Sequence, residues 1–223
     1  MAGVIVPDVR LFIQARMSSA RFPGKVLAPF CGRPLIASTI SRAADALGID
    51  RIVLATTTDD ADDPLAAYVR ELGVMVFRGS RDNVLGRLQE CLAAFPCRRF
   101  FRVCADSPLV DVDLIREMAA YAARPDLDLV TNVFPRTFPK GQSLELIAAD
   151  TFAAIDGDLL DDAAREHVTR VYYDQPTRFR ILNLTAPDHS CVGLNLAVDT
   201  LDDLRRIEAL ASAGNWHADI SGG

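Results

Sequence analysis

The chain has 223 residues, half of them hydrophobic, which suits one large α/β domain with a substantial core. Its net charge of −6, from 24 basic and 30 acidic residues, lacks the basic excess of a nucleic-acid binder, so we expect no nucleic-acid partner. The five cysteines are an odd number without a Cys-x-x-Cys pair, which favours reduced thiols. No segment has the length of a membrane span or the pattern of a signal peptide, so we expect a cytoplasmic protein without a membrane partner.

Strand and helix patterns alternate over the first 133 residues. Apolar runs predict strands at 9–13, 51–56, 74–77, 100–104 and 129–133. Amphipathic segments between them predict helices at 34–47, 64–72, 82–95 and 111–123. This alternation is typical of right-handed βαβ units and a mainly parallel sheet.

After residue 133 the alternation is interrupted by turns at Pro135, Pro139 and Gly141. The later pattern predicts strands at 143–147, 179–184 and 194–198, and helices at 161–174 and 201–211. Neither an internal repeat nor a linker divides the chain. We therefore expect a single three-layer α/β/α domain over residues 1–223, with a Rossmann-like, mainly parallel mixed sheet.

The loop behind the first predicted strand, residues 14–25, is the strongest functional signal. It reads Gln-Ala-Arg-Met-Ser-Ser-Ala-Arg-Phe-Pro-Gly-Lys. Its small residues let backbone N–H groups approach phosphate oxygens, and Arg16, Arg21 and Lys25 add two planar forks and a mobile point charge. Ligand sites of open α/β sheets lie at such strand ends, so the sequence predicts a triphosphate-binding loop. A solvated surface loop is the alternative.

Two well-known phosphate loops do not fit this segment. A Walker A loop ending at Gly24-Lys25 needs Gly at position 19 and Ser or Thr at 26, where this chain has Ser19 and Val26. The dinucleotide fingerprint Gly-x-Gly-x-x-Gly does not follow the first strand.

Two aspartates at predicted strand ends are candidate magnesium ligands. Asp106 follows the strand at 100–104, and Asp199 follows the apolar run at 194–198. Magnesium bound to a triphosphate commonly takes one or two carboxylates besides phosphate oxygens. The alternatives are an Asx turn for Asp106 and a helix N-cap for Asp199.

Other polar clusters carry less weight. Asp59, Asp60, Asp62 and Asp63 precede a helix, where acidic residues cap and stay mostly solvated. Residues 97–99, Cys-Arg-Arg, are interpreted as a turn, and Cys104 as a small core residue.

Several segments together resemble the cytidylyltransferase family. They are 13–16 with 23–25, 77–80 with 83–85, 105–109, 138–141 leading to Glu145, 165–169 and 196–200. The likeness is closest to the spore-coat polysaccharide biosynthesis type, related to 3-deoxy-manno-octulosonate and acylneuraminate cytidylyltransferases. It runs from about residue 11 to about residue 210.

The resemblance implies a GT-A-like nucleotidyltransferase that transfers CMP from CTP to an anionic acceptor, releases pyrophosphate and works as a homodimer. It implies that residues 9–133 hold the nucleotide and about 134–200 the acceptor. The implied catalytic residues are Lys25, Arg16 and Asp106, with Mg²⁺ on Asp106 and Asp199. The implied nucleotide contacts are Gln14, Ala15, Arg16, Ser19, Arg21, Lys25, Arg78, Gly79, Ser80, Ala105 and Ser107. The implied acceptor contacts are Lys140, Gln142, Ser143, Glu145, Glu166 and His167.

The chain departs from the family at Ser143, where relatives commonly place an aspartate in Pro-x-Gly-x-Asp-x-Glu. With one carboxylate fewer, the acceptor side of the site is less negative, which suits an anionic acceptor. A nonulosonic acid, a phosphorylated sugar or polyol, and a phosphonate all remain candidate acceptors. Two other functions remain alternatives: a glycosyltransferase that uses an NDP-sugar, and a non-catalytic nucleotide-binding module.

Overall fold

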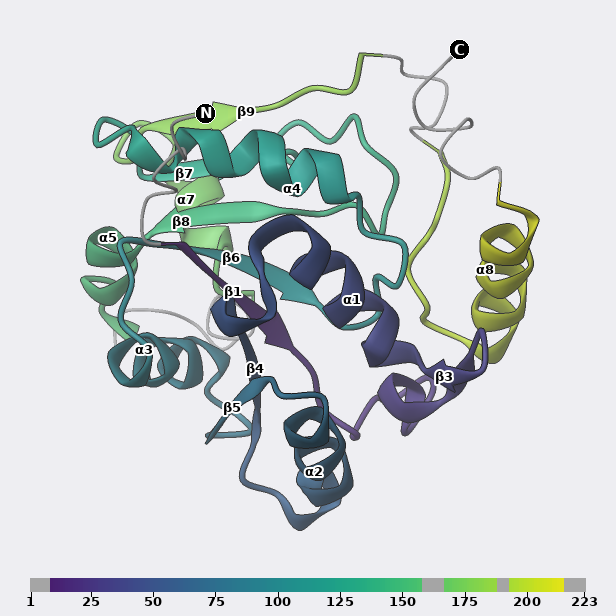
Figure 1. Cartoon of the computed structure of the whole chain (residues 1–223). Coiled ribbons are helices and arrows are strands. Elements are labelled where there is room, and N and C mark those ends of the chain that lie inside the picture. Colours follow the sequence, from purple (N-terminus) through teal and green to yellow (C-terminus); the bar gives the residue numbers. More distant parts are fainter. Residues whose placement is uncertain (1–8, 158–166, 188–192, 215–223) are drawn as a thin grey trace, which may run out of the picture.

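The computed structural model describes residues 9–157, 167–187 and 193–214, and a seven-stranded sheet forms its middle layer (Figure 1). The strand order is β5-β4-β1-β6-β8-β7-β9. The strands are β1 (Val9–Gln14), β4 (Ile52–Thr57), β5 (Met75–Gly79), β6 (Arg99–Cys104), β7 (Leu129–Thr131), β8 (Glu145–Ala148) and β9 (Ile181–Asn183). A separate hairpin pairs β2 (Pro29–Phe30) with β3 (Arg33–Pro34).

Helices cover both faces of the sheet, which confirms the predicted three-layer fold. The described α-helices are α1 (Leu35–Leu47), α2 (Asp63–Glu71), α3 (Val84–Ala94), α4 (Val112–Ala119), α5 (Ala149–Ala153), α7 (Arg170–Asp174) and α8 (Leu201–Ala213). Buried residues of α1, α2 and α4 pack on one face, and those of α3, α5 and α7 on the other. The helix α8 lies beside the hairpin, at a distance from the centre of the sheet (Figure 1).

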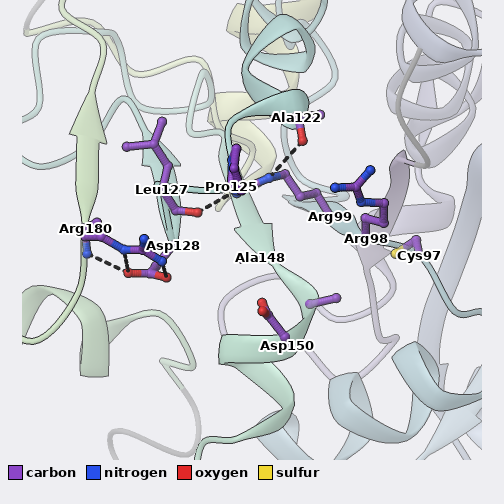
Figure 2. A pocket seen from close by; sticks show the side chains of 11 residues that line it. Cys97, Arg98, Arg99, Ala122, Pro125, Leu127, Asp128, Ala148, Asp150 and Arg180 are labelled. Carbon is purple, nitrogen blue, oxygen red and sulfur yellow. Dashed lines mark hydrogen bonds and ion pairs between the residues drawn. The ribbon is translucent and has the colours of Figure 1, made fainter. Parts of the chain in front are cut away.

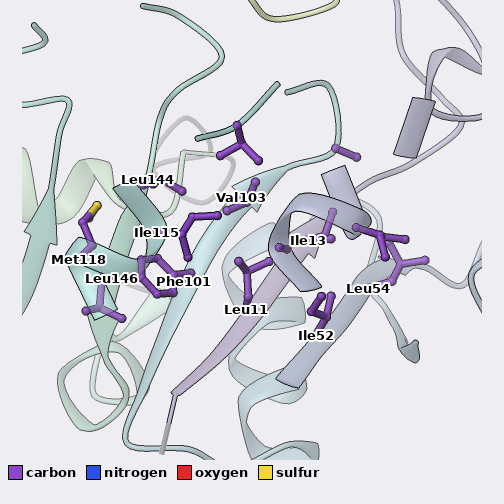
Figure 3. Packing of buried hydrophobic residues seen from close by; sticks show 14 of the residues in the cluster. Leu11, Ile13, Ile52, Leu54, Phe101, Val103, Ile115, Met118, Leu144 and Leu146 are labelled. Carbon is purple, nitrogen blue, oxygen red and sulfur yellow. The ribbon is translucent and has the colours of Figure 1, made fainter. Parts of the chain in front are cut away.

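Alternation along the central strands fills the two core layers. In β1, Leu11 and Ile13 point into the first layer (Figure 3), and Phe12 points into the second, where it stacks on Phe100 at 4.8 Å. In β6, Phe101 belongs to the first layer and Phe100 to the second. Because side chains alternate with a period of two, Arg102 of β6 lies on the same face as Phe100.

The sheet is mixed, as expected. Strands β5, β4, β1 and β6 are parallel neighbours. Strand β8 runs antiparallel between β6 and β7, and β9 is parallel to β7. The antiparallel strand brings the second half of the chain directly beside β6, whose end carries Asp106.

The second half also differs from expectation. The predicted strand at 194–198 is wrong: the backbone–backbone hydrogen bonds that the structure describes for this segment are those of an isolated bridge with Lys140 and one from Val198 N to the Asp106 carbonyl at 2.8 Å. It has no continuous strand to pair with. Of the helix predicted at 161–174, the described part is helical only from Arg170, and 161–166 lie outside the described residues. The helix α5 and the hairpin were not predicted.

Within the described ranges, we find no helix with the length and apolar character needed to cross a membrane.

Candidate functional site

A cleft of about 490 Å³ opens at the carboxyl edge of β1 and β6. Many of the predicted site residues line it: Gln14, Ala15, Arg16, Ser19, Arg21, Lys25, Ala105, Asp106, His167 and Asp199. Outside the loop at 14–25, five lining residues were not predicted as site residues, namely Val26, Val84 and Arg87 of α3, and Arg102 and Cys104 of β6. The loop at 14–25, the two candidate aspartates and part of the later half of the chain therefore share one cavity.

The loop at 14–25 is closed by its own backbone. The carbonyl of Met17 accepts hydrogen bonds from Ser19 N at 2.9 Å and Gly24 N at 2.8 Å. Gly24 has a φ of +73°, a left-handed conformation that favours glycine, and it turns the chain into the short 3₁₀ helix Lys25–Leu27. The turn directs Lys25 back beneath the loop.

Asp62 holds the loop from the side, contrary to the expectation that the acidic cluster is mostly solvated. Its side chain accepts from Met17 N at 2.7 Å, Thr56 Oγ1 at 2.9 Å and Thr57 Oγ1 at 2.5 Å, and the residue is 1% exposed. Burial acts to raise the pKa of the Asp62 carboxyl, but these hydrogen bonds outweigh it and hold the pKa below its usual value. The loop is thus tied to the end of β4 through a buried carboxylate.

Lys25 lies at the centre of the cleft and joins the two aspartates. Its Nζ donates to Asp106 Oδ2 at 2.9 Å and to the carbonyl of Val198 at 2.7 Å, and lies 3.4 Å from Asp199 Oδ1. The side chain is only 11% exposed. The two predicted metal ligands are therefore brought together around one ammonium group.

Asp199 is buried and surrounded by positive charge. Besides Lys25, its carboxylate pairs with Arg21 at 2.8 Å and Lys140 at 2.7 Å. Burial acts to raise its pKa, but the Lys140 hydrogen bond and the three positive charges outweigh it, so the pKa of Asp199 lies below its usual value. Asp199 is therefore ionised at neutral pH.

Gly141 brings Lys140 to Asp199. Its φ is +96°, and an added Cβ would lie 2.4 Å from the backbone carbon of Leu196. On either side of this contact, Lys140 N donates to Leu194 O and Leu196 N donates to Lys140 O. Only glycine allows the two backbones to approach this closely.

The predicted nucleotide contacts of β5 lie outside the cleft lining. Arg78 donates to the carbonyls of Thr57 and Asp59, both at 2.8 Å, and pairs with Asp63. It braces the loop that carries Asp62. Gly79 ends β5, and the carbonyl of Ser80 accepts from Arg87 Nη1 at 2.6 Å.

Ser107 also lies outside the cleft lining: it is buried, and its carbonyl accepts from Thr39 Oγ1 at 3.3 Å. Arg87 lines the cleft but was not predicted, because the residue spacing of its helix indicates only which face is buried and not which side chains reach a binding site.

The predicted acceptor residues occupy different positions. His167 is exposed in the cleft, whereas Glu166 lies outside the described residues. Ser143 accepts from Arg136 at 2.9 Å.

Gln142 does not fit its prediction, because it is fully buried and its amide binds the backbone at Leu109 and Asp111. Its neighbours in the sequence motif gave no sign of that burial.

Glu145 is nearly buried and both of its oxygens have partners. Arg102 donates to Oε2 at 2.8 Å, and Tyr173 donates to Oε1 at 2.6 Å. Arg102 also donates to the side-chain oxygen of Gln14. The two partners were not predicted, because strand register and a distant helix bring them to Glu145.

Comparison with known proteins identifies the family. Residues 11–202 match the cytidylyltransferase family. The chain is 31% identical over 222 residues to the spore coat polysaccharide biosynthesis protein SpsF of Bacillus subtilis, covering 96% of this chain and 90% of that protein. The chain belongs to the cytidylyltransferase family.

Solved structures agree on the fold. A cytidylyltransferase from Leptospira borgpetersenii superposes with a TM-score of 0.87 at 22% identity, covering 97% of this chain and 98% of that one. A CMP:2-keto-3-deoxy-manno-octonic acid synthetase complexed with CTP gives a TM-score of 0.66 at 17% identity, covering 93% and 99%. Its membership of the cytidylyltransferase family makes this chain a nucleotidyltransferase, which sets aside the non-catalytic alternative.

A divalent metal fits the donors of this cytidylyltransferase only together with a ligand. Within the described ranges, no group of three or more His, Cys, Asp or Glu side chains could hold a metal ion. Asp106 and Asp199 provide two carboxylates beside one ammonium group. That set matches an ion that completes its shell with phosphate oxygens and water.

Cys104 lies in the cleft wall rather than in the core. It is partly exposed, and burial raises the pKa of its thiol to about 11. A neutral thiol is a poor nucleophile, so the cytidylyltransferase site gives no support for a covalent cysteine intermediate.

A second pocket of about 270 Å³ lies near the opposite end of β6 (Figure 2). The guanidinium of Arg180 donates two hydrogen bonds to the Asp128 carboxylate there, at 2.8 and 3.0 Å, and the backbone N of Arg180 donates a third at 2.8 Å. Arg99 is buried and donates to the carbonyls of Ala122, Arg124 and Leu127. These contacts fasten the segment between α4 and β7, so the arginines have a structural role here.

Proposed function

We propose that this cytidylyltransferase transfers CMP from CTP to an anionic sugar, polyol or phosphonate acceptor, with Mg²⁺ and release of pyrophosphate, in the synthesis of a surface polysaccharide or glycoconjugate. The observation that carries the proposal is the position of Lys25, between Asp106 and Asp199 and directly beneath the loop at 14–25. The name of SpsF and the CTP complex of the synthetase support the choice of pathway and nucleotide.

The reaction is an in-line displacement at the α-phosphorus. An acceptor oxygen forms a bond to phosphorus while the bond to the bridging oxygen of the β-phosphate breaks and pyrophosphate leaves. A phosphate or phosphonate acceptor attacks as an anion, whereas a hydroxyl acceptor must also lose its proton. Transfer of this kind depends mainly on positioning and electrostatics, so no enzyme nucleophile is needed.

The chain's own cations would hold the triphosphate. Arg16 and Arg21 lie along the loop, and Lys25 can exchange a carboxylate for a phosphate oxygen because its ammonium is a mobile point charge. Each such contact stabilises the charge that develops on the leaving pyrophosphate.

Asp106 and Asp199 would hold the divalent cation, since both are in the cleft and share Lys25. When bound, the cation supplies further positive charge at the phosphate oxygens. Asp199 is already ionised, so it can accept a metal ion at neutral pH without losing a proton.

The acceptor would approach from the side of residues 134–200. Lys140 and Arg136 lie on that side, and Ser143 adds no negative charge between them. Such a wall favours an acceptor that carries a negative charge.

The test is pyrophosphate release with Mg²⁺ for each of CTP, UTP, ATP and GTP, against pooled acidic sugars, sugar phosphates and phosphonates. We expect acceptor-dependent release with CTP only, and division of the pool then names the acceptor. Release of an NDP from NDP-sugars, with no pyrophosphate from any nucleotide, would instead support the glycosyltransferase alternative.

A further inference from the structure

A chain of polar contacts crosses the sheet below the cleft, from Gln14 in β1 through Arg102 in β6 and Glu145 in β8 to Tyr173 in α7. Arg102 and Glu145 are directly opposite residues of the antiparallel pair β6–β8. Tyr173 adds a contact to Thr131 in β7, at 2.9 Å between the two hydroxyl oxygens. The network therefore spans four neighbouring strands at the place where the two halves of the chain meet.

The network orients one guanidinium group. Nε of Arg102 is bound to Gln14, and Nη1 is bound to Glu145. Within the described residues, Nη2 has no hydrogen-bond partner, and the side chain is 19% exposed and lines the cleft. Its remaining donors are thus available to a bound molecule while the other two nitrogens fix its direction.

Glu145 is poorly placed to contact an acceptor directly, because its side chain is nearly buried, lies outside the cleft lining and has a partner on each oxygen, Arg102 and Tyr173. Burial and the nearby Glu145 raise the pKa of Tyr173, so its hydroxyl stays a donor. The carboxylate is 5% exposed in its side chain, and it acts on the cleft through Arg102.

The charges nearby favour an anion. Arg102 and Glu145 compensate each other, and Arg136 adds a further positive charge through its bond to Ser143, two residues before Glu145. Arg16 lines the same cleft. A carboxylate or phosphate group at Arg102 would therefore meet a net positive environment.

Arg102 also has different partners from two of the triphosphate cations, Arg21 and Lys25. Arg21 and Lys25 gather at Asp199, whereas Arg102 bonds to Glu145 of β8, which lies beyond β6 in the strand order. We propose that Arg102 binds the negatively charged group of the acceptor, a carboxylate or a phosphate, and that Glu145 is its positioning residue. This assignment rests on the proposed function and adds to it the residue that recognises the acceptor.

The first experiment compares Arg102→Gln and Arg102→Lys with Arg98→Gln, which removes an exposed arginine outside the cleft. Acceptor KM is measured by pyrophosphate release at saturating CTP, and CTP affinity by calorimetry. We expect Arg102→Gln to raise acceptor KM about tenfold or more and to leave CTP affinity within about twofold. Arg102→Lys should restore only part of the lost acceptor affinity, because lysine keeps the positive charge but lacks the planar guanidinium that binds an oxyanion through two donors. Arg98→Gln should change neither value.

Acidic sugars and sugar phosphates are assayed separately. The class of acceptor whose KM rises in Arg102→Gln shows whether Arg102 binds a carboxylate or a phosphate. Glu145→Gln should raise acceptor KM by a smaller factor with little change in kcat, whereas a merely structural role would lower thermal stability and leave KM unchanged. Loss of CTP affinity in Arg102→Gln with unchanged acceptor KM would overturn the proposal and assign Arg102 to the nucleotide.

A second measurement does not depend on turnover. Inorganic phosphate and pyruvate are titrated into protein saturated with a non-hydrolysable CTP analogue, which fills the triphosphate loop. We expect wild-type protein to bind at least one of them and Arg102→Gln to bind it about tenfold more weakly. Equal affinity in both proteins, or no binding to wild type, would contradict the role of Arg102. Absence of pyrophosphate release with every acceptor would contradict the proposed function instead.

Discussion

The Asp199 carboxylate forms ion pairs with three side chains from separate parts of the chain: Arg21, Lys25 and Lys140. Lys25 differs from the other two because it is buried and also binds Asp106. Removal of its ammonium would leave two close carboxylates with less compensation and would remove a charge from the phosphate site.

We expect Lys25→Ala and Asp106→Asn each to lower turnover by roughly a hundredfold or more, which corresponds to about 3 kcal/mol of transition-state stabilisation. The measurement is pyrophosphate release by protein whose circular dichroism shows it to be folded. Near-normal turnover by either folded variant would show that the pair does not serve the reaction.

The buried carboxylate of Asp62 should contribute to the stability of the fold. Its carboxylate accepts from a backbone N–H of the loop and from two threonine hydroxyls, and an amide in its place cannot satisfy every donor at the same oxygens. We expect Asp62→Asn to lower the free energy of unfolding by about 1–3 kcal/mol at pH 7 in urea titrations. Asp63→Asn, at a more exposed ion pair with Arg78, should cost less than about 1 kcal/mol.

The same carboxylate should make stability depend on pH. The folded pKa of Asp62 lies below the ordinary aspartate value, so its contribution is complete above about pH 4 and is lost as the pH falls through the folded pKa. The stability difference between wild type and Asp62→Asn should therefore shrink as the pH is lowered below about 4. A difference that is constant over this range would contradict the assigned role.

At the scale of elements, the close approach of residues 140–142 to 194–198 places Asp199 in the cleft. Gly141→Ala would put a Cβ 2.4 Å from the Leu196 backbone at a φ of +96°. Gly32 in the β2–β3 hairpin offers a matched control, with a φ of +77° and no atom within 4 Å of the added Cβ.

We expect Gly141→Ala to lose about 1–3 kcal/mol or more of stability and to lower turnover by more than about tenfold, since it displaces the segment that carries Asp199. Gly32→Ala should cost only about 1 kcal/mol of backbone strain and keep its turnover. Thermal melts and pyrophosphate release of the two variants provide the comparison. Equal effects on turnover would show that the approach at Gly141 does not position the site.

At the scale of the whole molecule, the sequence pattern predicted the first half well because each strand and helix there is local and strongly periodic. Gly48 and Gly73 mark helix ends where they were expected. The segment at 194–198 was misassigned because an apolar run alone does not show whether a neighbouring strand is available. The place of β8 between β6 and β7 depends on long-range pairing, which local periodicity cannot reveal.

The site follows the same division. The loop at 14–25 and Asp106 follow β1 and β6, and the carboxyl ends of adjacent parallel strands meet at one edge of a sheet, so their shared position could be predicted. Asp199 also reaches the cleft, although the segment before it is not a strand. Arg102 and Tyr173 were missed because cross-strand register and a distant helix bring them to Glu145. Gln142 was placed wrongly because its burial is a property of tertiary packing.

The most direct test of the central claim follows the phosphorus atoms of CTP. The protein is incubated with Mg²⁺, the acceptor pool and CTP that is radioactively labelled at either the α- or the γ-phosphate, and the products are separated. We predict that the α-label appears in a new CMP ester and the γ-label in pyrophosphate. Appearance of the γ-label in inorganic phosphate or in the acceptor would contradict nucleotidyl transfer at the α-phosphorus.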